Sequence, residues 1–483
     1  MNFARDLVDA APSRRVAVVE LDAQGGRREW TFGEVSHRSA RLAGTLRSRG
    51  VRRGDVVLTL IGNRPDWIAT MVACFRIGAV VLPCTEQLRA KDLRLRLQVA
   101  QPRLIVCDAR NRDELQGALV GGLSSIPVLF VPDERIYRVE PVAPVELHPD
   151  DPCLITFTSG TSGEAKAVLH AQRYLAGQHA QAEHWLDARP GDLVWCTASS
   201  GWSKSARNVF IAPWIRGASA LLHDARFDPH ERMAIAARER VNVLCMAPTE
   251  YRVIAKRGTL TGSPHLRGLV AAGEALNPEV LRAWHAETGR WIRDGYGQTE
   301  TGQLTGMPLG IDAVPGSMGR PLPGVGLTVQ DGELVLDPAT DPTFFLGYLG
   351  DEPWDRTQPW RTGDRVHQDE DGFLHFEGRA DDVIISAGYR IGPFEVESAL
   401  VSHPLVAEAA AVAAPDDERG SVVRAIVVLR PGVVVYAGLA RELQEHVKAQ
   451  TAPYKYPRIV EFADALPKTA SGKVRRSLLR EER

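Results

Sequence analysis

The strongest constraint on the fold is a series of short apolar runs that alternate with amphipathic stretches through the first two-thirds of the chain. One such stretch, PDWIATMVACFRIGA (65–79), predicts a helix between two of the runs. The runs cover residues 55–63, 80–84, 103–108, 127–131, 153–158, 192–198, 218–224 and 242–248. Continuous apolar runs alternating with helices are typical of strands that are buried on both faces of mostly parallel sheets. The sequence therefore predicts layered α/β architecture for this part.

The pattern changes near residue 312. Residues 312–378 are rich in Gly and Pro and contain short alternating runs, which predict a small antiparallel barrel or sheet. The rest of the chain reads as helices and strands in mixed order. Expected helices are 394–404 and 437–451, and expected strands are 407–415 and 423–431. We therefore expect an α+β module of roughly a hundred residues after the Gly- and Pro-rich part.

The charge balance excludes several classes of partner. The chain has 58 basic and 60 acidic residues and a net charge of -2, so no broad basic field is available for nucleic acid or an anionic membrane. No uncharged run approaches the ~18 residues that a membrane span needs. The six cysteines are widely spaced without a CxxC pair, and the first residues carry no secretory signal. We expect no nucleic-acid partner, no membrane insertion and a cytoplasmic location.

The segment FTSGTSGEAK (157–166) follows an expected strand and combines two glycines, four hydroxyls and a lysine. Glycines allow backbone N–H groups to approach an anion, hydroxyls add donors, and the lysine adds a mobile positive charge. This composition predicts a phosphate-binding loop. The spacing from Gly160 to Lys166 does not fit GxxxxGK[ST], so the segment is not a Walker A loop.

Five further segments extend this reading along the chain. They are AAGEAL (271–276), GYGQTETG (295–302), RTGDR (361–365), GRADDVIISAGYRIGPFEVE (378–397) and PKTASGKVRR (467–476). Together with TSGTSGEAK, they resemble, in order, the motifs of the ANL superfamily of adenylating enzymes. The C-terminal sequence is most similar to that of medium-chain acyl-CoA synthetases.

This resemblance implies a fold and a reaction. The fold would be α/β, with a large N-terminal domain (1–380) made of two layered α/β subdomains and a small β-barrel-like subdomain. A mobile α+β C-terminal domain (381–483) would follow. The reaction would be ATP-dependent acyl-CoA synthesis: a carboxylic acid and ATP form an acyl-adenylate and pyrophosphate, and coenzyme A then takes the acyl group and releases AMP. A medium-chain fatty acid or an aromatic acid is the expected substrate.

The nucleotide would be bound by residues from each motif. Tyr296 offers a flat face for adenine, Asp364 can accept both ribose hydroxyls, and Glu300 can bind Mg²⁺ beside the phosphates. Arg379 and Arg390 could pair with ribose or phosphate oxygens. The whole expected set is Thr158, Ser159, Gly160, Thr161, Ser162, Gly163, Lys166, Gly273, Glu274, Ala275, Asp294, Gly295, Tyr296, Gly297, Gln298, Thr299, Asp364, Arg379 and Arg390.

The resemblance also implies catalytic and hinge residues. Lys473 would bridge the acid carboxylate and the α-phosphate, with Thr299 and Glu300 beside the phosphates. Asp381 would be the hinge about which the C-terminal domain rotates between the two half-reactions. Only eight of the 58 basic residues are lysines, so Lys473 stands out in an arginine-rich tail. Coenzyme A would contact Gly388, Tyr389, Arg419 and Tyr456.

Two residues bear on the acyl pocket. Acetate-specific relatives place a tryptophan immediately before Gln-Thr-Glu, whereas this chain has Gly297, which leaves room for a larger acid. Trp202, in SSGWSKSARNVF, is expected to line the same cavity. Hydrophobic pockets discriminate weakly per methylene, so a broad substrate range is expected.

Simpler readings remain open for single residues: Asp364 as a turn aspartate, Trp202 as a core aromatic and Arg419 as a surface charge. For the whole chain, one alternative is a ligase that loads an aryl or amino acid onto a carrier protein. Another is a degenerate protein that binds ATP or acyl-AMP without catalysis. A homodimer is also left open.

Overall fold

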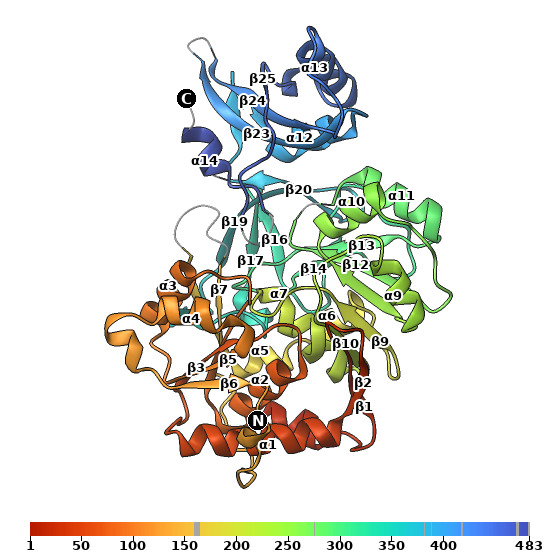
Figure 1. The fold of residues 1–483 in the computed structure, drawn as a ribbon. Coiled ribbons are helices and arrows are strands. Elements are labelled where there is room, and N and C mark those ends of the chain that lie inside the picture. The colour runs from red at the N-terminus through yellow and green to blue at the C-terminus, as the bar shows by residue number, and fades with distance from the viewer. Residues whose placement is uncertain are drawn as a thin grey trace.

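The computed structural model describes residues 1–158, 165–274, 276–380, 382–387, 389–416, 419–469 and 473–481, without the side chains of Arg390 and Glu481. Figure 1 shows a large lower part that contains the N-terminus and a smaller C-terminal module stacked on it. The cavity described below lies between these two parts.

Two seven-stranded sheets form the large part. The first has the order β18-β8-β7-β4-β3-β5-β6 and the second the order β13-β12-β11-β9-β10-β1-β2. Neighbouring strands are parallel except at one edge of each sheet, where β8 and β18 in the first and β2 in the second run antiparallel. The strands of the first sheet are β3 (Val56–Leu60), β4 (Val80–Cys84), β5 (Leu104–Asp108), β6 (Val128–Val131), β7 (Pro152–Phe157), β8 (Ala167–Ala171) and β18 (Gly347–Tyr348). Those of the second are β1 (Val16–Leu21), β2 (Arg27–Thr31), β9 (Leu193–Cys196), β10 (Ser219–His223), β11 (Val243–Met246), β12 (Gly268–Ala272) and β13 (Ile292–Gly295).

The helices of this part pack against the sheets. They are α1 (Phe32–Ser48), α2 (Pro65–Ile77), α3 (Ala90–Ala100), α4 (Arg112–Ala118), α5 (Gln172–Ala176), α6 (His179–His184), α7 (Ser203–Ala206), α8 (Ala212–Ile215), α9 (Arg232–Arg238), α10 (Pro248–Arg257) and α11 (Pro278–Thr288). A π-helical turn, Arg207–Ile211, joins α7 to α8. Pro65 occupies the first turn of α2, and Gly78 ends it with a φ of 72°.

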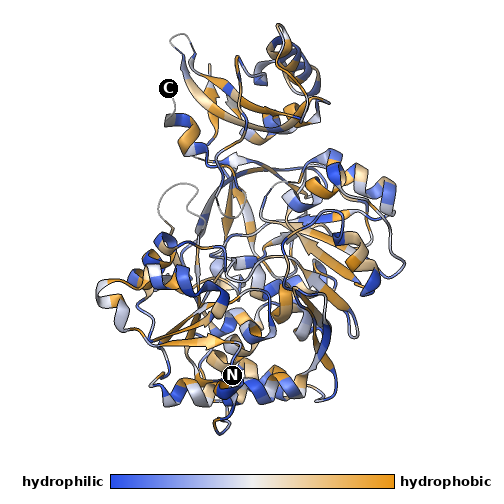
Figure 2. Ribbon diagram, viewed as in Figure 1, coloured by the Kyte–Doolittle hydropathy of each residue, from blue (hydrophilic) through white to orange (hydrophobic). Residues whose placement is uncertain are grey.

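The largest core lies between the two sheets. It includes Trp67 and Phe75 from α2, Val81 from the first sheet and Val270 from the second. Every residue from Asp66 to Ile77 is buried, which agrees with the largely apolar sequence of this helix. Orange strands enclosed by helices with mixed colours show the same burial in Figure 2. All six cysteines are free and buried in these layers, and Cys196 lies opposite Cys245 on neighbouring strands.

The Gly- and Pro-rich part forms an open four-stranded antiparallel sheet, β16-β17-β19-β20, rather than a closed barrel. Its strands are β16 (Leu327–Gln330), β17 (Glu333–Leu336), β19 (Trp360–Gln368) and β20 (Leu374–Arg379), with the short pair β14 (Thr305–Gly306) and β15 (Arg320–Pro321) nearby. The expected "barrel or sheet" is therefore a sheet.

The C-terminal module has its own three-stranded sheet, β23-β24-β25, and its own core. Its strands are β23 (Val406–Asp416), β24 (Gly420–Leu429) and β25 (Ile459–Phe462), its helices are α12 (Pro393–Ser402), α13 (Leu439–Gln450) and α14 (Arg476–Glu481), and the hairpin β21 (Ile384–Ser386) and β22 (Tyr389–Ile391) precedes them. The expected α/β fold with a smaller α+β module is confirmed. The boundary at residue 380 stays a prediction.

Candidate active site

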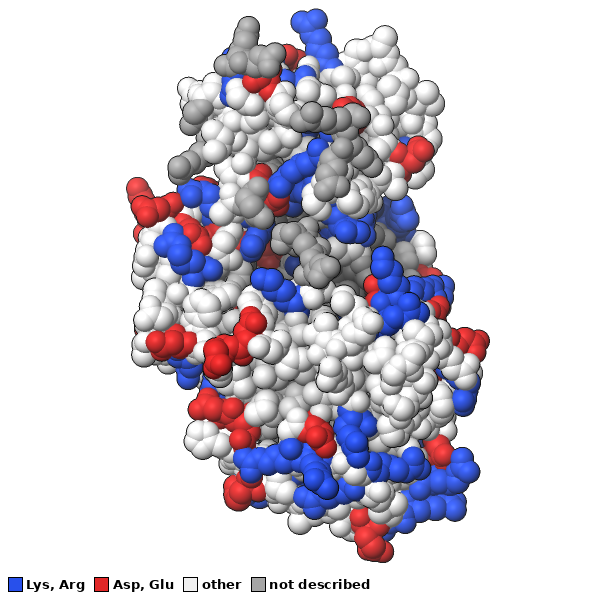
Figure 3. Space-filling model, turned by 90° about the vertical axis from the view of Figure 1, so that its left-hand side faces the viewer, with Lys and Arg blue, Asp and Glu red and all other residues white. Residues whose placement is uncertain are grey.

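A cavity of about 2020 Å³ lies between the large part and the C-terminal module. Its walls come from the carboxyl ends of parallel strands in both large sheets, from β19 and β20, and from residues 466–480. The carboxyl ends of parallel strands are where α/β sheets bind their ligands. Figure 3 shows Lys and Arg side chains along the waist between the two parts. The topology thus brings the expected motifs to one place.

The expected phosphate loop begins and ends at this cavity. Residues 159–164 lie outside the described residues, but Thr158 and Lys166 on either side line the cavity. The Thr158 N–H donates to the Lys166 carbonyl at 2.9 Å, and the Lys166 N–H donates to Oγ1 of Thr158 at 3.0 Å. These two bonds join Thr158 to Lys166 and so bring the two ends of the expected loop together at the cavity.

Asp364 is the centre of a buried polar network. Its Oδ2 accepts hydrogen bonds from the Tyr296 hydroxyl and, at 2.7 Å, from Nε2 of Gln298. Nη1 of Arg379 lies 3.2 Å from its Oδ1. Burial raises the pKa of Asp364, and Arg379 opposes that rise. The network makes a simple turn aspartate a poor description of Asp364, because its carboxylate joins three separate motifs.

Glu300 lines the same cavity as Lys166. Its Oε1 accepts a hydrogen bond from the Tyr348 hydroxyl at 3.0 Å, and Nζ of Lys166 lies 4.8 Å from the centre of the Tyr348 ring. Tyr348 therefore contacts both residues: its hydroxyl bonds the expected metal ligand Glu300, and its ring faces the loop lysine. The sequence analysis missed Tyr348, which belongs to an edge strand 48 positions after Glu300.

Lys473 reaches the same cavity from the C-terminal module. Its backbone pairs with Thr469 through two hydrogen bonds, 2.8 and 3.2 Å long, and Lys468 bridges to Val474. Burial lowers the pKa of the Lys473 amine, Glu274 and Asp364 oppose this shift, and Lys204 and Arg379 add to it. The amine thus shares the cavity with Glu274, Asp364 and Arg379, which belong to three of the expected motifs, and with Lys204.

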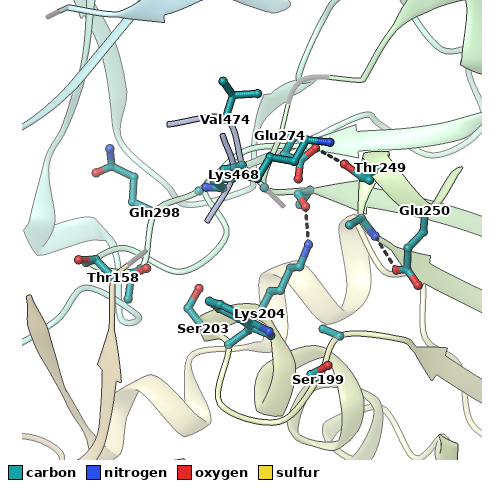
Figure 4. A pocket seen from close by; sticks show the side chains of 18 of the residues that line it. Thr158, Ser199, Ser203, Lys204, Thr249, Glu250, Glu274, Gln298, Lys468 and Val474 are labelled. Atoms are coloured by element: carbon teal, nitrogen blue, oxygen red, sulfur yellow. Dashed lines mark hydrogen bonds between the residues drawn. The ribbon is translucent and has the colours of Figure 1, made fainter. Parts of the chain in front are cut away.

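Glu274 and Asp294 mark the β12–β13 side of the cavity. Oε2 of Glu274 accepts a hydrogen bond from the Thr249 hydroxyl at 2.7 Å, which Figure 4 shows. Asp294 is buried and accepts the N–H of Gly295 at 2.9 Å. Because burial raises its pKa to about 8, this carboxyl is mostly protonated at neutral pH and can donate a hydrogen bond.

The comparisons with known proteins agree with this arrangement. Residues 5–342 match the family described as AMP-binding enzyme, and residues 395–473 match the AMP-binding enzyme C-terminal domain. The chain belongs to the AMP-binding enzyme family.

Relatives span the whole chain. The mitochondrial acyl-coenzyme A synthetase ACSM3 of Mus musculus is 36% identical over 524 aligned positions, covering 100% of this chain and 90% of the mouse protein. The crystal structure of Brucella canis acyl-CoA synthetase is 33% identical with a TM-score of 0.74, covering 100% of this chain and 94% of that one. A benzoate CoA ligase from Burkholderia xenovorans LB400 is 26% identical with a TM-score of 0.87, covering 99% and 100%. The expectation of an AMP-forming acid–CoA ligase that acts through an acyl-adenylate is confirmed.

In this AMP-binding enzyme, Trp202, which precedes α7, and Ser203 and Lys204, which begin it, all line the cavity. Trp202 is partly exposed to the cavity rather than enclosed in the core. Sequence analysis did not single out Lys204, although the scarcity of lysine in the chain was a usable signal. Nζ of Lys204 donates to the Ala272 carbonyl at 3.2 Å.

Gly297 also lines the cavity, and the fold of the chain around it leaves no room for a side chain. A Cβ at this position would lie 1.8 Å from the Gly302 carbonyl oxygen. The turn 297–302 therefore needs glycine at 297, whatever acid the pocket accepts.

Tyr389, Arg419 and Tyr456, three of the residues expected to contact coenzyme A, belong to the C-terminal module. The exposed Tyr389 ring stacks on Tyr454 at 4.4 Å, the Arg419 carbonyl accepts the Ala387 N–H at 3.0 Å, and the Tyr456 ring faces Lys448. None of Tyr389, Arg419 and Tyr456 is among the described residues that line the cavity. Gly160, Ala275, Asp381 and Gly388, like the rest of 159–164, lie outside the described residues, as does the side chain of Arg390.

No group of three or more His, Cys, Asp and Glu side chains that could hold a metal ion occurs in the described part of the chain. Among the same residues, no helix is long and apolar enough to cross a membrane.

Proposed function

We propose that this acyl-CoA synthetase activates a medium-chain or aromatic carboxylic acid, with Lys473 as the catalytic lysine of the adenylation step. The observation that carries the proposal is the position of Lys473 in the cavity with Glu274, Asp364 and Arg379. In this arrangement the amine can neutralise the charge that develops as an acid carboxylate attacks the α-phosphorus of ATP. The new bond joins the carboxylate oxygen to phosphorus, and pyrophosphate leaves.

The other residues would orient the nucleotide. Asp364 accepts the ribose hydroxyls, Tyr296 carries adenine, and Thr158, Thr299 and Lys166 bind phosphates. Fixed donors of this kind stabilise developing charge without reorganising.

Glu300 is proposed to hold Mg²⁺. A magnesium ion bound to a nucleotide takes most of its ligands from phosphates and water and needs only one or two protein carboxylates. A single carboxylate beside Lys166 therefore fits, although no larger cluster of metal-ligating groups occurs among the described residues. When bound, the ion would neutralise phosphate charge.

The second half-reaction is proposed to follow rotation of the C-terminal module about Asp381. In the arrangement described here, Lys473 faces the cavity and Tyr389, Arg419 and Tyr456 lie outside it. Rotation would withdraw the lysine and bring these residues and Gly388 to the acyl-adenylate. A hinge is needed because one site serves both steps in turn. The cytoplasmic location and a homodimer remain predictions.

A screen of linear, branched and aromatic acids from two to twelve carbons for AMP formation, with and without free coenzyme A, tests the proposed function. Lys473→Ala should lose acid-dependent ATP–pyrophosphate exchange by about 10²-fold or more and still convert supplied acyl-AMP to acyl-CoA. Equal loss of both reactions would contradict the role of Lys473.

Gly388→Leu is the matching variant for the second step. It should retain exchange and block thioester formation, because a side chain would fill the proposed path of the pantetheine thiol. If exchange disappears as well, Gly388 does not line that path.

A further inference from the structure

Two cationic side chains stand one helical turn apart on the acyl side of the cavity. Lys204 belongs to α7 and Arg207 begins the π-helical turn that follows it, and both line the cavity. Residues three apart on a helix face the same side. Neither side chain forms an ion pair with a carboxylate in the part of the chain that the structure describes.

Arg207 is buried, with only 4% of its surface exposed. Its Nε and Nη1 have no hydrogen-bond partner among the described residues. Nη1 lies 3.4 Å from the position that a Cβ on Gly302 would take, so the guanidinium lies against the turn 297–302. A buried charge with unused donors is costly unless something pairs with it.

The groups next to Arg207 do not supply that partner. The Tyr174 hydroxyl contacts it, and the buried ring of His170 stacks on Tyr174 at 4.1 Å. Burial, with Arg207 and Arg173 nearby, lowers the pKa of His170 to about 3, so this ring is neutral. Both neighbours leave the positive charge of Arg207 uncompensated.

Lys204 stands between Arg207 and the proposed reaction centre. Figure 4 shows its side chain rising from α7 toward the end of β12, where Nζ meets the Ala272 carbonyl. The same amine lies 3.4 Å from the position of a Cβ on Gly273. Lys473, Lys204 and Arg207 thus all add positive charge to the same cavity.

Three carboxylates that line the cavity already have other partners, and Asp341, a buried carboxylate close to Tyr174, accepts hydrogen bonds from Thr343 through Oδ1. Glu274 accepts from Thr249, Glu300 accepts from Tyr348, and Glu250 accepts from Arg232 at 3.1 Å. Lys204 and Arg207 therefore add positive charge to the cavity wall that these carboxylates do not neutralise through an ion pair.

We propose that the acid has a second carboxylate at its far end, which Arg207 binds with Lys204 in support. This inference rests on the proposed function, because it names the substrate class of the same site. A guanidinium in a water-poor pocket recognises a carboxylate through charge-assisted hydrogen bonds. An uncharged alkyl end would leave Arg207 buried and unpaired, which opposes binding of a simple fatty acid.

The test compares acids that differ only at the far end: suberate with octanoate, and terephthalate with benzoate. We expect kcat/KM for AMP formation with coenzyme A to favour each dicarboxylate by about 10²-fold or more, since a site built for a polar group rejects the analogue that lacks it. Arg207→Met should abolish the preference for the dicarboxylate and raise the relative use of octanoate. Arg207→Lys, which keeps a positive charge, should retain part of that preference.

Arg226→Met is the matched control, because Arg226 lines the same cavity but is exposed. It should leave the preference unchanged; a similar loss would mean that the general field of the cavity, not Arg207, selects the dianion. Octanoate used as well as suberate by the unaltered enzyme would overturn the inference, as would an Arg207→Met variant that slows all acids equally. Absence of AMP formation with every acid would instead contradict the proposed function.

Discussion

Gly297 affects both the size of the pocket and the conformation of the turn that begins with it. Its lack of a side chain suggested an open acyl pocket, but the turn 297–302 folds back so closely that the Gly302 carbonyl occupies the place of a Cβ. Pocket size and loop geometry are therefore coupled at one position. A larger residue here cannot simply close the pocket, because the turn that carries Thr299 and Glu300 would have to move first.

Gly297→Ala tests this coupling. A contact of 1.8 Å forces a backbone shift, so we expect lower thermal stability, by about 1–3 kcal/mol, and at least tenfold slower ATP–pyrophosphate exchange. Gly122→Ala is the control, since Gly122 has open space around it. Unchanged exchange in Gly297→Ala would mean that the turn adapts without displacing Thr299 or Glu300.

At the scale of elements, the segment that carries Lys473 is fixed to its own module by ion pairs. Nη2 of Arg476 donates to both oxygens of Glu397 at 2.8 Å, and Glu397 also accepts the Ala411 N–H at 2.8 Å. Arg480, one turn later, pairs with Asp382. These bonds join α14 to α12, to β23 and to Asp382 beside the proposed hinge, and so anchor the segment that carries Lys473.

Arg476→Met should loosen this anchor. We expect a stability loss of about 2 kcal/mol, because Glu397 is left partly buried without its cation, and exchange slowed more than thioester formation from supplied acyl-AMP. Arg441→Met, on the exposed face of α13, is the control and should change neither. If both half-reactions slow equally, Arg476 acts only through folding.

The sequence predicted strands well where a single physical rule determines them. The runs 80–84 and 103–108 contain the buried strands β4 and β5, because a continuous apolar run of this length has few other ways to be buried. Contacts between segments that lie far apart in the chain could not be predicted from the sequence. Tyr348 holds Glu300 only because an edge strand of the first sheet passes the turn 297–302, and Arg207 is informative only because its guanidinium is unpaired. Neither the contact of Tyr348 with Glu300 nor the unpaired state of Arg207 leaves a pattern in the neighbouring sequence.

At the scale of the whole molecule, a few contacts hold the C-terminal module on the large part. Nζ of Lys256, at the end of α10, donates to the Ala407 carbonyl of β23 at 3.0 Å. Burial, with Arg430 and Arg252 nearby, lowers the pKa of Lys256 to about 8. This bond belongs to the arrangement in which Lys473 faces the cavity, so it is expected to break when the module rotates.

Lys256→Ala should therefore shift the balance between the two arrangements. Loss of one hydrogen bond of about 1 kcal/mol corresponds to roughly fivefold slower exchange, with acyl transfer to coenzyme A unchanged or faster. Lys91→Ala, on the exposed surface of α3, serves as the control. A variant that slows acyl transfer as much as exchange would show that Lys256 does not favour the adenylation arrangement.

The burial of every cysteine has a consequence for a site that produces a mixed anhydride. An acyl-adenylate reacts with any accessible thiolate, so an exposed cysteine beside it would be acylated and the activated acid wasted. Cys74, Cys84, Cys107, Cys153, Cys196 and Cys245 are all enclosed in the layers, and none of them lines the cavity. Burial raises the pKa of Cys84 to about 11, which leaves that thiol protonated. Because no cysteine faces the cavity, the enzyme offers no thiol of its own to the intermediate, and the acyl group is kept for the incoming substrate.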